Sequence, residues 1–315
     1  QGHISVGVSI GGINVTSREC RDIPSLLTRA EMALQVAKER GRGCFVSYSE
    51  AAGQAINNRI MLEAGDEFLL ALKEDRVCLA FQPVVDFGRQ EVSFHECLIR
   101  MIGEDGKLRS AAEFVPAIEH LGLSRLVDQF ALNKALHELN QFPDLVLSVN
   151  VSYMTLISKE WLRGLVSSLR DLPSVARRLI IEITEGMVIK DVSRAILVVK
   201  TLKEMGCRIA LDDFGSGFTA FSQMRDMALD IVKIDKSFIR NIKDERNHLF
   251  VKTLRMLADG VNIQTVGEGV ETLEDARILA KEGINHIQGY AFGFPCVERI
   301  WLPKGHAFRQ FGDAA

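Results

Sequence analysis

Short runs of apolar residues alternate along most of the chain with longer stretches whose apolar residues recur at helical spacing. The short runs are typical of buried strands, and the longer stretches, such as 193–205 and 249–259, predict amphipathic helices. A short turn at 87–91 joins the first two runs, which indicates an antiparallel pair. The expected strands are 77–86, 92–101, 145–152, 179–184, 208–214, 231–236, 262–268 and 286–292.

This alternation predicts an α/β fold of the TIM, or (β/α)8, barrel type. The direct turn between the first two strands would make it a modified barrel with an antiparallel first strand. An open doubly wound sheet is the alternative. We favour the barrel because polar residues end nearly every strand, whereas an open sheet would concentrate them at one switch point.

The first fifty residues carry a different pattern. Residues 4–10 and 44–48 are expected to form strands, and residues 24–39 a helix that Gly41 and Gly43 bring to an end. One helix and two strands bury too little apolar surface to fold alone, so we expect a small α+β fragment of a larger domain. Residues 50–76 predict a further helix.

The composition is that of a soluble globular protein, because 47% of the 315 residues are hydrophobic and 25% are charged. The formal net charge is −3 at pH 7, so no basic excess indicates a long nucleic acid as partner. A small phosphorylated ligand is compatible with this charge because it needs only a few local contacts.

The six cysteines are scattered without a CxxC pair, which argues against a structural zinc site and a disulfide framework. We therefore expect a reducing, cytoplasmic compartment. No uninterrupted apolar run reaches the ~18 residues of a membrane helix, so no membrane segment is expected in this chain. Because the chain begins at Gln1, we expect it to be part of a longer protein, whose anchoring in a membrane stays open.

Residue types that carry chemistry end most of the expected strands. Asp212 and Asp213 close one apolar run, and a loop with Gly215 and Gly217 follows. A salt bridge at the rim would explain one such acid equally well, but side chains from seven strands converge on one mouth if the barrel closes. Clustered carboxylates repel one another, and hard cations such as Mg²⁺, Mn²⁺ or Ca²⁺ relieve that repulsion. The strand-end residues are Glu96, Asn150, Glu182, Asp212, Asp213, Lys233, Glu268 and Gln288.

Eight short motifs stand in order along the chain: Gln82-Pro-Val-Val-Asp86, Glu96-Cys-Leu-Ile-Arg100, Asn150-Val-Ser152, Glu182-Ile-Thr-Glu185, Asp212-Asp-Phe-Gly-Ser-Gly-Phe218, Lys233-Ile-Asp235, Glu268-Gly-Val-Glu271 and Gln288-Gly-Tyr290. Together they resemble the EAL-domain family, whose members are phosphodiesterases for cyclic di-GMP built on a modified TIM barrel. The resemblance covers residues from about 60 to 303.

The resemblance implies a site for two divalent cations, Mg²⁺ or Mn²⁺, with Ca²⁺ as an inhibitor. The residues that match ligands of the first cation are Glu96, Asn150, Glu182 and Asp212. The residues that match ligands of the second are Asp212, which would bridge the two cations, Asp213 and Glu268.

Further roles follow from the same resemblance. Catalytic roles fall on Glu96, Lys233, Glu268 and Gln288, where Lys233 positions the attacking water and Gln288 supplies an amide. Glu185 matches the acid that anchors the loop after Asp213. Strand alternation turns His95 and Cys97 away from the site. The residues that match substrate contacts are Gln82, Leu98 and Arg100.

The function that the resemblance implies is metal-dependent hydrolysis of cyclic di-GMP to linear pGpG. The alternative is a catalytically silent EAL domain that binds cyclic di-GMP as a receptor. Silent members usually lose metal ligands, whereas this chain keeps all of them. A homodimer is also expected, as are upstream sensory domains in the longer protein.

The first fifty residues resemble the C-terminal end of a GGDEF domain, the diguanylate cyclase fold, through Ser9-Ile10-Gly11, Ala30-Glu-Met-Ala-Leu34, Ala37-Lys38 and Gly41-Arg42-Gly43. The signature loop of that domain is absent from this chain, so no synthesis of cyclic di-GMP is expected from it. The expected domains are a GGDEF-like fragment over 1–49, a helical linker over 50–59, the EAL barrel over 60–305 and a tail over 306–315.

Overall fold

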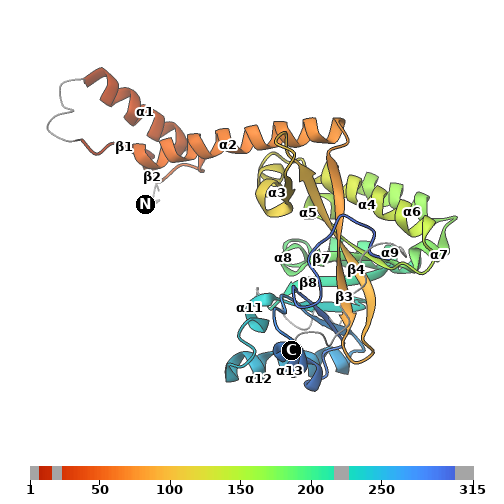
Figure 1. Ribbon diagram of the computed structural model, residues 1–315. Helices are drawn as coiled ribbons and strands as arrows, with labels where there is room; N and C mark the ends of the chain where they lie inside the picture. The colour runs from red at the N-terminus through yellow and green to blue at the C-terminus, as the bar shows by residue number, and fades with distance from the viewer. Residues whose placement is uncertain (1–6, 16–22, 216–226, 302–315) are drawn as a thin grey trace, which may run out of the picture. The chain divides into compact units, whose positions relative to one another are not determined.

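The computed structural model describes residues 7–15, 23–215 and 227–301, and the side chains of residues 54 and 55 are not described (Figure 1). The chain divides into two compact units, and each is described by itself. One unit comprises Gln1–Leu70 with Pro116–Leu121, and the other comprises Ala71–Val115 with Gly122–Ala315.

The smaller unit contains β1 (Ile10–Gly12), α1 (Ile23–Glu39) and β2 (Phe45–Ser47), in which β1 and β2 pair in parallel. The prediction of a strand over 4–10 is wrong for residues 7–9, which lie outside any strand. Residues 4–6 of that prediction fall outside the described residues. Gly11 explains the shift. Its Cα lies so close to α1 that a Cβ would be 2.2 Å from the backbone nitrogen of Leu34, so the paired segment is centred on this glycine.

Helix α2 (Tyr48–Lys73) follows β2 directly, so residue 48 is helical rather than extended and the helix ends before residue 76. The end has a local cause, because Asp75 has a left-handed backbone with a φ of 54°. The amide of Arg76 then donates to the carbonyl of Ala71, as at other helix ends of this type.

The larger unit is a closed barrel of eight strands, as predicted from the sequence (Figure 1). The strand order is β3-β11-β10-β9-β8-β7-β6-β4, and β4 pairs with β3 to close the ring. β3 is antiparallel to both neighbours, and every other pair in the ring is parallel. The strands are β3 (Val77–Asp86), β4 (Glu91–Ile102), β6 (Leu147–Asn150), β7 (Leu179–Thr184), β8 (Arg208–Phe214), β9 (Ile231–Ile234), β10 (Gln264–Gly267) and β11 (His286–Gln288).

One strand prediction needs correction, and one short strand was not predicted. The strand expected over 286–292 ends at Gln288, because Gly289 begins a turn in which the amide of Phe292 donates to its carbonyl. A short strand that we did not predict, β5 (Leu108–Ser110), extends the antiparallel edge of β4. Three residues are too few to give a readable hydrophobic pattern.

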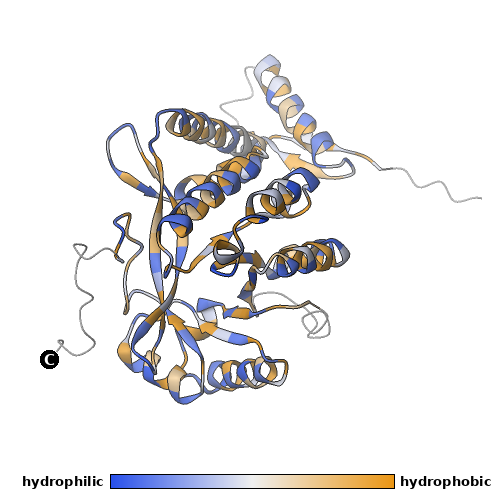
Figure 2. Ribbon diagram, turned by 90° about the vertical axis from the view of Figure 1, so that its right-hand side faces the viewer, coloured by the Kyte–Doolittle hydropathy of each residue, from blue (hydrophilic) through white to orange (hydrophobic). Residues whose placement is uncertain are grey.

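Helices lie outside the strands of the barrel, and Figure 2 shows hydrophobic and hydrophilic residues alternating along them. The expected helices 193–205 and 249–259 correspond to α9 and α12. α12 begins earlier than expected, because Asp244 accepts hydrogen bonds from the amides of Arg246 and Asn247. No helix in the described part of the chain is long and apolar enough to cross a membrane. The helices are α3 (Ala111–His120), α4 (Ser124–Gln141), α5 (Tyr153–Leu156), α6 (Lys159–Leu169), α7 (Pro173–Ala176), α8 (Glu185–Lys190), α9 (Val192–Glu204), α11 (Lys236–Ile239), α12 (Glu245–Gly260) and α13 (Leu273–Lys281).

Candidate active site

The polar residues of the site lie directly above an apolar layer of the barrel interior. Because side chains alternate between the two faces of a strand, residues two apart along it share a face. Ile180 therefore precedes Glu182, and Ile231 precedes Lys233, on the inward face of their strands. The packed layer comprises one residue from each of six strands: Val84, Phe94, Ile180, Ala210, Ile231 and Val266. The residues two positions away from these six, in the same order, are Gln82, Glu96, Glu182, Asp212, Lys233 and Glu268.

Lys233 is the centre of the site. It is almost completely buried, and its ammonium contacts carboxylates from four other strands or strand ends. The Nζ atom lies 2.8 Å from Glu182 Oε2, 3.1 Å from Glu96 Oε2, 2.8 Å from Glu268 Oε1 and 3.4 Å from Asp212 Oδ1. A buried charge is tolerated only when it is paired, so these contacts fix the position of the lysine.

Two carboxamides bind Glu96 directly and fix its orientation, and a third carboxamide contacts one of the two. Asn150 Nδ2 donates to Glu96 Oε1 at 2.8 Å, and Gln288 Nε2 donates to Glu96 Oε2 at 2.6 Å. Gln288 Nε2 also lies 3.1 Å from Gln82 Oε1, and Gln82 Nε2 donates to the carbonyl of Gly293 at 3.1 Å. Residues from β3, β4, β6 and β11 thus form one hydrogen-bonded network at one side of the site.

Asp212, Asp213 and Glu268 form an acidic cluster at the other side. One carboxylate oxygen of each lies within 4.8 Å of the others. Neighbours on a regular strand would point to opposite faces, but Asp213 has a φ of 55°, and the pairing of β8 with β9 is irregular between Leu211 and Phe214. The left-handed backbone therefore brings both carboxylates to one site.

Burial and charge together decide which groups of the site hold a proton. Burial alone would lower the pKa of Lys233, but the surrounding carboxylates, Asp212 foremost, raise this pKa well above its ordinary value. Burial and the nearby charge of Glu96 raise the pKa of Glu182 to about 8. For Glu96, burial is outweighed by Lys233 and by the amides of Gln288 and Asn150, so its pKa is lowered.

Near the mouth, burial raises the pKa of Glu268 well above its ordinary value despite the ammonium of Lys233. Partial burial and the charge of Asp212 likewise raise the pKa of Asp213. These directions show that one ammonium does not neutralise the carboxylates around it.

The residues present fit divalent cations of the hard type. Glu182 Oε1 and Gln288 Oε1 are buried and have no hydrogen-bond partner among the described residues, although both are strong acceptors. Carboxylate and amide oxygens are the ligands that Mg²⁺ and Mn²⁺ prefer. Such cations could be held by the acidic cluster, with Glu96, Asn150 and Glu182 beside it.

The other predicted site residues lie on the same strands or next to them. Leu98 and Arg100 follow Glu96 on the same face of β4, nearer to its end. Arg100 Nη1 donates to the carbonyl of Ile99 at 2.8 Å, so one of the guanidinium nitrogens of Arg100 already has a hydrogen-bond acceptor. Glu185 is buried at the start of α8, where its Oε2 accepts the amide of Gly215 at 3.0 Å.

His95 and Cys97 point to the other face of β4, as strand alternation predicts. The His95 ring lies 5.4 Å from that of Trp301, and burial lowers the pKa of this histidine to about 4. Burial raises the pKa of the Cys97 thiol well above its ordinary value. The described cysteines form no disulfide.

Gly289 is a positioning residue that the sequence reasoning missed. A Cβ at this position would lie 2.1 Å from the carbonyl oxygen of Val270. Without a side chain there, the Val270 amide donates to the carbonyl of Gln288 at 3.0 Å, and the Ala291 amide donates to the carbonyl of Val270 at 3.1 Å. These bonds join the segment after Glu268 to the segment after Gln288. The glycine directly after a strand-end glutamine was the available signal.

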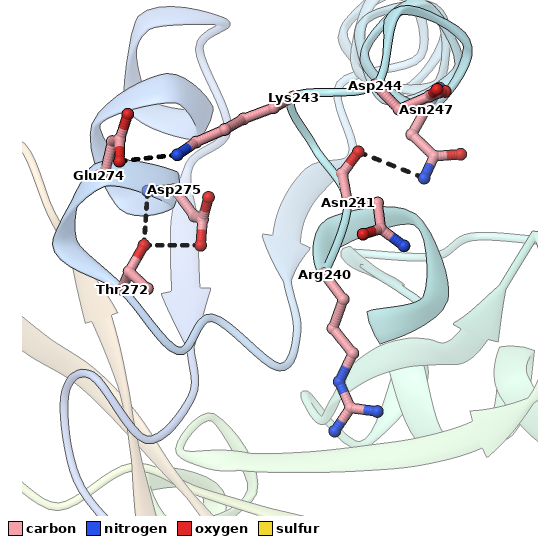
Figure 3. Close-up of a pocket in the computed structure, with 8 residues that line it drawn as sticks. All are labelled: Arg240, Asn241, Lys243, Asp244, Asn247, Thr272, Glu274 and Asp275. Carbon is pink, nitrogen blue, oxygen red and sulfur yellow. Dashed lines mark hydrogen bonds and ion pairs between the residues drawn. The ribbon is translucent and has the colours of Figure 1, made fainter.

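A separate polar cavity of about 470 Å³ lies at the starts of α12 and α13, and Figure 3 shows the residues that line it. None of the predicted site residues lines it. Its lysine, Lys243, is paired with Glu274 at 2.7 Å, and Thr272 and Asp244 accept backbone amides of the helix starts. These contacts account for the polar character of the cavity without a ligand.

Comparison with known proteins identifies the family. The EAL domain model matches residues 66–295. Signaling protein YkoW from Bacillus subtilis (strain 168) is 29% identical over 295 residues, which cover 91% of this chain and 36% of that protein. Cyclic di-GMP phosphodiesterase PdeR from Escherichia coli (strain K12) is 27% identical over 289 residues, which cover 90% of this chain and 43% of that protein. The chain thus spans less than half of the length of these curated relatives.

A solved structure described as PaMucR phosphodiesterase in complex with c-di-GMP matches with a TM-score of 0.72. The match covers 76% of this chain and 100% of that chain at 24% sequence identity, so it supports the fold. The matched family model spans most of the barrel and contains all the strand-end residues of the site. The chain therefore belongs to the EAL-domain family.

Proposed function

We propose that this chain hydrolyses cyclic di-GMP to linear pGpG with the help of two divalent cations. One observation carries the proposal. Four carboxylates surround a single buried ammonium, that of Lys233, at the mouth of the barrel, and a fifth, that of Asp213, lies beside two of them. Two buried acceptor oxygens there have no hydrogen-bond partner among the described residues. The name of the PdeR relative and the description of the MucR complex support the choice of substrate.

The residues proposed to hold the cations fall into two groups that share Asp212. When bound, the cations would neutralise the phosphodiester and make a water molecule more acidic at neutral pH. Asp213 and Glu268 would hold one cation with Asp212, and the inner residues the other. The inner residues are Glu96, Asn150 and Glu182.

Lys233 would act as a hydrogen-bond donor and not as a base. Its raised pKa keeps it protonated, so its ammonium would orient the oxygen of the attacking water and compensate the negative charge that develops on the phosphorus oxygens. Gln288 and Asn150 would hold Glu96 in place through the contacts described above. Arg100 would donate to a phosphate oxygen of the substrate, with Gln82 and Leu98 beside it.

The reaction balances with water as the only co-reactant. The water oxygen forms a bond to phosphorus while the bond from phosphorus to the 3′ oxygen of one ribose breaks. The 3′ oxygen leaves with a proton, and the phosphate stays on the 5′ oxygen of the other guanosine. Opening one of the two phosphodiesters of the ring gives linear pGpG.

The organisation of the longer protein also belongs to this proposal. We infer that residues 1–49 are the end of a GGDEF domain, that 50–59 link it to the barrel over 60–305, and that 306–315 form a tail. A homodimer, upstream sensory domains and a cytoplasmic location complete this interpretation. The continuous helix α2 across residues 50–59 supports a helical connection.

Product analysis tests the proposal directly. The protein is incubated with cyclic di-GMP and either Mg²⁺ or Mn²⁺, and pGpG is separated by chromatography. We expect pGpG with either cation, no product in EDTA, and inhibition by Ca²⁺. Binding of cyclic di-GMP without turnover at both cations and at alkaline pH would instead identify a silent receptor.

A substitution on β4 tests the assigned roles. Glu96→Ala removes a proposed ligand of the first cation and the anchor of three other side chains, so turnover should fall by at least about 100-fold. Glu91→Ala on the same strand is the matched control, because Glu91 is exposed at its start and should leave the rate unchanged. Full activity of Glu96→Ala with an unchanged melting temperature would contradict the assignment.

A further inference from the structure

Two carboxylates lie on the buried face of α4, whose other residues are mostly apolar. Asp128 is 7% exposed and Glu138 is 6% exposed. The other buried residues of the helix are Ser124, Val127, Ala131, Leu132, Ala135 and Leu139. A carboxylate that loses its water needs hydrogen bonds or an opposite charge in return, so the partner of each acid indicates what that acid does.

The two acids have different kinds of partner. Glu138 accepts Arg299 Nη2 at 2.6 Å and Arg299 Nε at 2.8 Å, a double contact that joins α4 to the segment after β11. Asp128 Oδ2 instead accepts the backbone amide of Ser152 at 2.9 Å and the hydroxyl of Ser152 at 2.5 Å. Asp128 thus holds the segment that follows β6, whose last residue is Asn150.

The chain leaves β6 through two successive anchors. The pairing of β6 with β4 ends one residue before Asn150. The amide of Val151 then donates to the carbonyl of Glu182 at 3.0 Å, and the next residue, Ser152, binds Asp128. The backbone that follows Asn150 is therefore held first by β7 and then by α4.

The orientation of the Asn150 side chain depends on this backbone. Asn150 Nδ2 donates to Glu96 Oε1 at 2.8 Å, so the amide oxygen is the atom of this side chain that can bind a cation. A shift of the backbone at Ser152 would turn that oxygen or break the contact with Glu96. A carboxylate on a packed helix is a suitable anchor, because hydrogen bonds to an ionised group are about twice as strong as those between neutral groups.

We propose that Asp128 is a positioning residue of the first cation site. It contacts neither the cation nor the substrate, and it acts on Asn150 through Ser152. The inference rests on the proposed function, which makes Asn150 a ligand of the cation. Residues that orient a metal ligand in this way contribute about 10-fold to 100-fold to metal affinity.

Titration of Mn²⁺ into the metal-free protein tests the inference. Asp128→Ala should weaken Mn²⁺ binding by about 10-fold to 100-fold. Both hydrogen bonds go to one oxygen of Asp128, so Asp128→Asn keeps an oxygen that can accept them and should restore most of the affinity. Glu138→Ala is the matched control on the same buried face. It should lower the melting temperature by breaking the contact with Arg299 and leave the Mn²⁺ affinity unchanged.

Ser152→Ala provides a second test, which does not depend on the folding of Asp128→Ala. It removes the hydroxyl bond to Asp128 and leaves the amide bond, so the Mn²⁺ affinity should fall by less than in Asp128→Ala. An affinity of Asp128→Ala equal to that of Glu138→Ala would overturn the inference. If Asp128→Ala does not fold, an unchanged affinity of Ser152→Ala would overturn it.

Product analysis of the same proteins separates this inference from the proposed function. Hydrolysis of cyclic di-GMP by the unaltered protein, with a Mn²⁺ affinity that does not depend on Asp128, would overturn the positioning role and leave the function standing. A Mn²⁺ affinity that depends on Asp128, without hydrolysis, would support the positioning role and overturn the function. No binding of Mn²⁺ to the unaltered protein would overturn both.

Discussion

The backbone of Asp213 has a φ of 55°, a left-handed conformation that few residues other than glycine, asparagine and aspartate adopt. This turn places its carboxylate beside those of Asp212 and Glu268. The amide of Asp213 also donates to Asp212 Oδ1 at 2.9 Å, which fixes the orientation of the first aspartate. Local strain at a group of like charges is typical of a site that a ligand completes.

Asp213→Asn distinguishes the effect of the negative charge of this residue from the effect of its left-handed backbone, because the variant removes only the charge. Asparagine tolerates the left-handed conformation, so the melting temperature in EDTA should stay equal or rise, because one of three mutually repelling carboxylates is lost. The stabilisation that Mn²⁺ gives should shrink by about 1.4 kcal/mol for each tenfold loss of affinity. Thermal denaturation with and without Mn²⁺ measures both effects.

Asp213→Ala serves as the companion variant. This variant loses the same charge, but alanine has no polar side chain that could stabilise the left-handed backbone. The left-handed conformation should therefore cost the alanine variant about 1–2 kcal/mol of folding stability. Its melting temperature in EDTA should lie below that of the asparagine variant. Undiminished stabilisation of Asp213→Asn by Mn²⁺ would argue against this residue as a ligand.

Among the elements, the end of β8 is held by three helices. The amide of Gly215 donates to Glu185 on α8, and its Cα faces Phe238 on α11 and Phe250 on α12. The rings of these two phenylalanines stack with centroids 4.1 Å apart. The glycine has a φ of 97°, so both its backbone and its surroundings exclude a side chain. The site therefore depends on packing at one strand end as well as on its ligands.

Gly215→Ala should destabilise the fold by at least about 1–2 kcal/mol, because a Cβ would lie 2.9 Å from Phe238 and would force the left-handed backbone. Gly164→Ala in α6 is a matched control of opposite sign. Its Cβ would meet nothing within 4 Å, and alanine favours the helix by about 0.5–1 kcal/mol. Urea denaturation measures both. A loss of stability in Gly164→Ala as large as that in Gly215→Ala would contradict the packing argument.

At the scale of the whole molecule, the barrel closes through β3, the one strand of the ring that is antiparallel to its neighbours. A side-chain contact also links the strands on either side of it, because Ser93 Oγ on β4 lies 3.1 Å from His286 Nδ1 on β11. Burial lowers the pKa of His286. The charge of Asp86 acts to raise this pKa, and the charges of Arg208 and Arg89 act to lower it further. A neutral histidine thus takes part in closing the ring.

Acid should weaken the barrel through His286. In the unfolded chain this imidazole binds a proton near pH 6.5, whereas in the folded protein it does so only at lower pH. The unfolded state therefore binds more protons just below pH 6.5, and the stability lost as the pH falls reaches at most about 1.4 kcal/mol per pH unit. His286→Asn lacks this loss, so its stability should fall less than that of the unaltered protein between pH 7 and pH 5. Chemical denaturation at each pH measures the difference, and parallel curves would exclude the contribution.

Much of this protein could be predicted from its sequence alone. The short apolar runs identified Glu96, Glu182 and Lys233 as residues at the ends of buried strands, because such a run is a local property of the sequence. The short turn between the first two strands indicated the antiparallel pair, because so short a connection cannot cross over. The order of motifs indicated the EAL-domain family, which the family match confirms.

Other features required the tertiary structure, because they arise between residues far apart in the chain. The four carboxylates around Lys233 lie far apart in the chain, and that of Glu96 reaches the lysine because closure of the ring places β4 across the barrel interior from β9. The left-handed turn at Asp213 and the close approach of Gly289 to Val270 depend on backbone packing that no local pattern encodes. The sequence alone therefore determined the strands and the residue types of the site. Closure of the barrel decided which charges share the site, and the backbone conformation at Asp213 decided that both aspartates belong to it.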